Sequence, residues 1–137
     1  MGQLSAGFRE IEHTADWQLE AWAPELAGLL EQAARGMYSL TGVRLKSEPF
    51  IVRSFEISAK DAESLLVRFL SELLYIQEQE GLGFDGFELK LRDYNLAARL
   101  SGAPLASLGK EIKAVTYHNL VVQTNPQGLN VSIVFDV

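Results

Sequence analysis

The final stretch of the sequence, LNVSIVFDV, constrains the fold more than any other segment because apolar residues occupy every second position. Such alternation predicts a strand with one face in the core and the other toward solvent. The strand carries Asp136, a residue type disfavoured in strands, directly before the terminal carboxylate of Val137. Two ionised carboxylates this close repel each other unless water, a base or a cation lies between them. A hard divalent ion such as calcium would relieve that repulsion.

Two segments have the apolar spacing of amphipathic helices. In residues 24–42, leucines and small residues recur every three or four positions, and Gly42 is a suitable end point. Residues 61–80 have a wider apolar stripe, with Ser58 and Asp61 as candidate caps before it and Gly81 after it. We assign the stripe to the core rather than to a cofactor site. It comprises Ala62, Leu65, Leu66, Phe69, Leu73 and Ile76.

Most of the remaining chain has the pattern of strands. The predicted strands cover residues 8–12, 17–23, 49–58, 84–91, 96–100, 112–116, 120–124 and 129–137, with a loop at residues 101–109 and a turn at the NPQG motif. Roughly six to eight strands interspersed with two helices predict a two-layer α+β fold, in which both helices cover one face of a largely antiparallel or mixed sheet. We find no linker or internal repeat, so we expect a single domain over residues 1–137.

The composition restricts the class of protein. The hydrophobic content of 47% is that of a folded globular chain, and the net charge of −6 argues against a basic surface for direct nucleic-acid binding. The chain has no apolar run long enough to span a membrane and no signal-like start, so we expect a cytoplasmic protein without membrane contact. Because it has no cysteine, disulfides and thiolate chemistry are excluded.

Outside the final strand, few polar residues are candidates for chemistry. His13 and His118 are candidates for a zinc site or a general base, but no thiol or second histidine at helical spacing accompanies either, which disfavours a zinc site. Asp16 follows a turn-like stretch and is either a capping aspartate or a third oxygen ligand for a cation. Lys113 is either a solvated strand residue or a positive charge presented from a rigid element. The glycines of GLGFDG lack the lysine and hydroxyl of a phosphate loop.

Four blocks of the sequence, in order and across nearly the whole chain, resemble the archease family. They are FREIEHTAD followed by Glu20 and Ala21, DAESLLVRFLSELLYIQEQEGLGF, EIKAVTYHNL and the ending VFDV. The resemblance implies a small α+β protein that is not itself an enzyme. Such a protein activates the GTP-dependent RNA ligase of tRNA splicing and RNA repair, promoting guanylylation of the ligase and its multiple turnover with the help of a bound divalent metal.

The resemblance also implies roles for particular residues. The family's metal ligands fall on Asp16, Asp136 and Val137, with calcium as the expected ion, and Glu20, Lys113 and His13 are candidates for the functional surface. The sequence departs from the family pattern at Trp17 and Gln18, where a small aliphatic residue and a glycine are more usual, and in a shorter loop before Ile112.

Two other functions stay open on the sequence alone. One is a stand-alone metal-assisted phosphohydrolase, in which Asp16 and Asp136 hold the ion and His13 or His118 donates a proton. The other is a chaperone-like interaction module whose acidic end is merely solvated.

Overall fold

The computed structural model describes residues 5–11 and 17–137, which contain two helices and nine strands in two antiparallel sheets. The first sheet has the order β1 (Gly7–Ile11), β2 (Trp17–Ala23), β9 (Gly128–Asp136) and β7 (Ala114–Val115), with β8 (Gln123–Asn125) also paired with β9. The second has the order β3 (Arg44–Leu45), β6 (Asn95–Ser107) and β4 (Ile51–Ser58), with β5 (Leu82–Arg92) also paired with β6.

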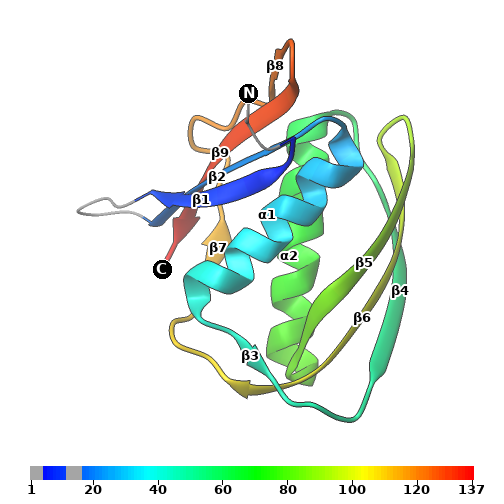
Figure 1. Cartoon of the computed structure of the whole chain (residues 1–137), viewed down its shortest axis with the longest axis vertical. Coiled ribbons are helices and arrows are strands. Elements are labelled where there is room, and N and C mark those ends of the chain that lie inside the picture. The colour runs from blue at the N-terminus through cyan, green and yellow to red at the C-terminus, as the bar shows by residue number, and fades with distance from the viewer. Residues whose placement is uncertain (1–4, 12–16) are drawn as a thin grey trace.

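The two helices link the sheets. Helix α1 (Leu26–Thr41) contacts β1, β2 and β9 of the first sheet and β5 of the second, while α2 (Ala62–Glu80) contacts β7 of the first and β4 and β5 of the second. Figure 1 shows both helices in the centre of the molecule, with β1, β2 and β9 on one side and β4, β5 and β6 on the other. The apolar stripe of each helix is therefore covered by strands from two sheets.

The ends of the helices follow from local chemistry. The Asp61 side chain caps α2 by accepting a 2.7 Å hydrogen bond from the Ser64 N–H, which holds the pKa of the Asp61 carboxyl below its ordinary value. Gly42 after α1 and Gly81 after α2 both adopt the left-handed conformation that glycine tolerates best. The predicted end points Gly42 and Gly81 and the predicted Asp61 cap are confirmed. Two start signals were wrong, because Ser58 belongs to β4 and α1 begins at Leu26, after Pro24, without a side-chain cap.

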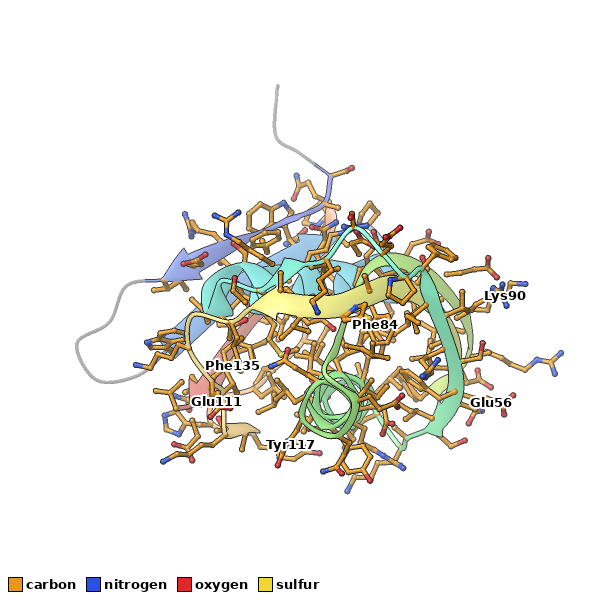
Figure 2. All side chains as sticks on the ribbon, turned by 90° about the horizontal axis from the view of Figure 1, so that it is seen from below. Glu56, Phe84, Lys90, Glu111, Tyr117 and Phe135 are labelled. Carbon is orange, nitrogen blue, oxygen red and sulfur yellow. The ribbon has the colours of Figure 1, made fainter. Side chains whose placement is uncertain are left out.

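The core is built on the pairing of β2 with β9. Leu19 lies opposite Ile133, and both side chains are fully buried. Phe135 at the end of β9 and Phe84 at the start of β5 are also buried, and Figure 2 places both inside the molecule. Because alternate residues of a strand face opposite sides of a sheet, burial of one set leaves the even-numbered residues of β2 and β9 on the outer face.

The structure confirms the α+β class, the two helices and the antiparallel pairing. The strands are divided between two sheets, a division that the pattern of residues did not reveal. The prediction of a loop at residues 101–109 was wrong, because β6 continues to Ser107. Gly102 makes this possible, since it lets β6 approach the backbone of Gly83 and Phe84 in β5 more closely than a side chain would permit.

Three short strands also differ from prediction. The strand expected at residues 112–116 is reduced to the two residues of β7, and that expected at 120–124 to the three residues of β8. Strand β3 was not predicted. The turn expected at NPQG does connect β8 to β9. In the part of the chain that the structure describes, no helix has the length and apolarity needed to cross a membrane.

Candidate functional site

Asp136 is the last residue of β9, and Val137 follows it directly, at one end of the first sheet. Asp136 is exposed on the outer face of the sheet. Its partner in β7 is Ala114, whose small side chain leaves room around the Asp136 carboxylate. Val137 is half-buried and packs against the core. The apolar side of β9 thus fixes the end of the strand, while Asp136 stays accessible to a cation or a partner protein.

Lys113 lies beside this end of β9. Its main-chain N–H donates a 2.7 Å hydrogen bond to the carbonyl oxygen of Asp136, while its side chain is exposed. Directly after β7, Thr116 bonds to the carbonyl oxygen of Val134 through both its N–H (3.1 Å) and its hydroxyl (2.9 Å). The structure therefore brings two of the predicted site residues, Lys113 and Asp136, together.

The start of β2 lies on the other side of β9, with Trp17 paired directly with Phe135. The ammonium group of Lys110 lies 4.6 Å from the centre of the Trp17 ring, a cation–π contact that joins the segment before β7 to β2. The backbone N–H groups of Gly109 and Lys110 donate to the Thr41 carbonyl oxygen at the end of α1. Sequence reasoning missed Lys110, although Trp17 stood out as a departure from the family pattern.

Glu20 lies away from Asp136. Its partner in β9 is Ser132, four residues before Asp136, and a rise of roughly 3.3 Å per residue separates the two positions by about 13 Å. The Glu20 carboxylate instead forms an ion pair with Arg9 of β1. This pair lines a concavity of about 490 Å³ on the outer face, together with Trp22 and Asn130. Glu20 is too distant to share a cation with Asp136.

Asp16 and His13 lie outside the described residues, so their predicted roles stay predictions. Among residues 5–11 and 17–137, no group of three or more histidine, aspartate or glutamate side chains is arranged to hold a metal ion. The predicted ligand set includes Asp16, and this finding therefore leaves it untested.

His118 lies in the irregular segment after β7. Its ring is exposed and its Nε2 is 3.2 Å from the side-chain nitrogen of Asn119, while its main-chain N–H bonds to the Thr116 hydroxyl. These contacts are local, and the His118 ring forms no salt bridge with a carboxylate of the described residues.

Comparison with known proteins agrees with this architecture. Residues 8–137 match the Archease protein family. The chain belongs to the archease family. It is 35% identical to the archease of Pyrococcus abyssi over 88% of this chain and 91% of that protein. It is 32% identical to the archease of Methanosarcina barkeri over the full length of both proteins.

Solved structures show the same fold. A crystal structure of a Thermotoga maritima protein, described as an archease and possible chaperone, matches with a TM-score of 0.70 and 24% identity over 94% of this chain and 96% of that one. The solution structure of a Methanobacterium thermoautotrophicum protein also has a TM-score of 0.70 and 24% identity, over 96% and 99% of the two chains. Both helices and both sheets thus belong to the fold of the family.

Proposed function

We propose that this protein activates a GTP-dependent RNA ligase and is not itself an enzyme. The ligase would join RNA ends carrying a 2′,3′-cyclic phosphate or 3′-phosphate to a 5′-hydroxyl, in tRNA splicing or RNA repair. The activator would promote guanylylation of the ligase and its multiple turnover in the cytoplasm. Membership of the archease family supports an accessory role, and so does the description of the Thermotoga maritima relative as a possible chaperone.

The observation that supports the metal site in this proposal is the pairing of Trp17 with Phe135. In the sequence, Asp16 directly precedes Trp17 and Asp136 directly follows Phe135, and the Cα atoms of consecutive residues are about 3.8 Å apart. Directly paired Cα atoms of antiparallel strands are about 4.5–5.5 Å apart. The pairing thus brings together Trp17 and Phe135, the sequence neighbours of the two predicted ligands, although they come from opposite ends of the sequence, and this supports the proposal.

The donor groups suit a hard divalent ion. We propose Asp16, Asp136 and the carboxylate of Val137 as its ligands, because calcium prefers several oxygen ligands that include carboxylates. When bound, such an ion would supply positive charge that neutralises nucleotide phosphates. The protein's own part is to hold the ligands in place. The half-buried Val137 side chain and the Lys113 backbone bond restrain the end of β9, and Lys113 adds an exposed positive charge beside it.

The charge of the protein supports a protein partner over direct RNA binding. A net charge of −6 repels the phosphate backbone of RNA. It would favour association with the basic surface that a ligase needs to bind its own RNA substrate. The exposed Asp136 is accessible to such a surface.

An assay of RNA ends with and without the ligase tests the proposal and separates it from a phosphohydrolase. The protein is incubated with RNA carrying a 2′,3′-cyclic phosphate, alone, with ligase, and with ligase and GTP. The proposal predicts that the protein alone does not change the RNA. It also predicts that ligase and GTP join the RNA ends faster with the protein than without it. Hydrolysis of the phosphate by the protein alone would contradict it, as would a joining rate that the protein leaves unchanged.

A further inference from the structure

A groove of about 630 Å³ lies between α2 and the chain that leads from β6 into β7. One wall is the C-terminal half of α2, and the other is the segment of residues 105–115. Residues from both walls that define its character are Leu74, Tyr75, Glu78, Leu108, Glu111 and Lys113. Lys113 also bonds to Asp136 through its backbone, so the groove ends beside the candidate site.

The groove has apolar residues on both walls and one exposed aromatic residue, Tyr75. Leu74 and Leu108 are half-buried, and Ile112, which also lines the groove, is buried. Tyr75 is 59% exposed, so its ring is available to pack against a partner. Tyrosine is enriched where proteins bind one another, because its ring buries area while its hydroxyl stays hydrogen-bonded.

The electrostatics of the groove favour a cationic occupant. Glu78 on one wall and Glu111 on the other are both exposed, and neither forms an ion pair with any described residue. Among the described residues that line the groove, Lys113 is the one basic residue, so acidic side chains outnumber basic ones there. The groove also lies at the C-terminal half of α2, where the helix dipole adds negative charge. No basic residue in the last turn of α2 offsets it. Lysine or arginine residues of a partner would complement this arrangement.

The backbone on the second wall can accept an extended chain. Within the described residues, the N–H and C=O groups of Glu111 and Ile112 form no backbone hydrogen bond. Segment 111–113 leads directly into β7, which is an edge strand of the first sheet. Unpaired backbone groups next to an edge strand are the usual means by which a protein binds an extended segment of another protein.

We propose that this groove binds an extended segment of the ligase, in which an apolar side chain is flanked by lysine or arginine. The inference rests on the proposed function, because it takes the ligase as the partner. The apolar side chain packs on Leu74, Tyr75 and Leu108, and the basic residues lie near Glu78 and Glu111. Docking there places the ligase next to Asp136.

The proposal that the groove binds the ligase is tested by measuring the affinity of the purified ligase for variants of this protein. The test variants are Glu78→Lys and Glu111→Lys, singly and combined, and the matched control for each single charge reversal is Glu56→Lys. Glu56 is exposed on β4, and Figure 2 shows it on the opposite side of the molecule from Glu111. A second pair compares Tyr75→Ser with Tyr94→Ser, since Tyr94 is 40% exposed in the turn between β5 and β6. Thermal unfolding of each variant checks that the fold is retained.

We expect the double charge reversal and Tyr75→Ser each to weaken ligase binding by about tenfold or more, while each control stays within about threefold of the original chain. Hydrogen exchange at Glu111 and Ile112 should slow when ligase is added. If the original chain binds ligase and the groove variants bind equally well, the groove assignment is wrong and the activator function stands. If the original chain does not bind ligase, both proposals are wrong.

Discussion

The main-chain nitrogen of Lys113 lies 2.7 Å from the carbonyl oxygen of Asp136, and its N–H donates a hydrogen bond to that oxygen. This bond connects two features of the surface. The Asp136 carboxylate belongs to the candidate metal site, whereas Lys113 also lines the groove beside α2. A partner that binds in the groove therefore contacts residues whose backbone is bonded to the end of β9.

Thr116 should stabilise the same region. Its hydroxyl donates to the Val134 carbonyl and accepts from the His118 N–H, so Thr116→Val removes both bonds while keeping the shape of the side chain. We expect the free energy of unfolding to fall by about 1 kcal/mol in urea denaturation. Thr124→Val on the exposed strand β8 is the control and should change it by less than about 0.5 kcal/mol. Equal effects of the two substitutions would show that the Thr116 bonds contribute nothing.

Calcium binding should depend on Asp136 and not on Glu20. Asp136→Asn removes a charged ligand, and we expect calcium affinity measured by calorimetry to fall by about tenfold or more. Asp16→Ala and a chain extended past Val137 should weaken it similarly. Glu20→Gln should leave it unchanged, because Glu20 lies about 13 Å along the ladder and is paired with Arg9. Equal calcium affinity in all these proteins would refute the proposed ligand set.

Gly102 should tolerate no side chain. A Cβ atom on Gly102 would overlap the carbonyl oxygen of Gly83 and lie 2.7 Å from the Cα of Phe84, both in the paired strand β5. Because backbone atoms cannot move aside as a side chain can, Gly102→Ala should destabilise the protein by about 3 kcal/mol. Gly81→Ala meets no atom within 4 Å and bears only the strain of φ +68°, so it should cost about 1 kcal/mol. Equal losses of stability in the Gly102→Ala and Gly81→Ala variants would show that β5 and β6 can move apart to admit a side chain.

Stability in acid should depend on Asp61. The Ser64 N–H lowers the pKa of the Asp61 carboxyl below its ordinary value, so the folded state binds this proton less readily than the unfolded state. The resulting stabilisation is present above the unfolded pKa and is lost as pH falls through the lower folded pKa. The variant Asp61→Asn caps a helix comparably but does not titrate. The difference in unfolding free energy between the original chain and this variant, measured in urea, should therefore shrink from neutral pH to about pH 2. A constant difference would contradict this.

The parts of the fold that were predictable are those with local patterns. Helix α2 has a capping aspartate, an apolar stripe and a terminal glycine within one segment, and β9 has strict alternation. By contrast, the extension of β6 past Ser101 depends on a close approach of Gly102 to β5, which no local pattern reveals.

The candidate site was predictable in its residue types but not in its surroundings. Asp136 stood out because a carboxylate is unexpected at the end of an alternating strand. The Lys113 backbone bond to Asp136 and the separation of Glu20 from Asp136 follow from strand register, whereas the Lys110 contact with Trp17 follows from the path of the segment between β6 and β7. Register joins residues that are distant in sequence, so the spacing of residues along the chain could not supply it.

The central claim, activation of a GTP-dependent RNA ligase, is tested most directly by the rate at which that ligase is guanylylated. The rate constant is measured in a single turnover with labelled GTP, for ligase alone, with this protein and with its Asp136→Asn variant. We predict that the original chain raises the rate constant by about tenfold or more and that Asp136→Asn leaves it at the rate of ligase alone. A rate constant that the original chain does not change would contradict the account.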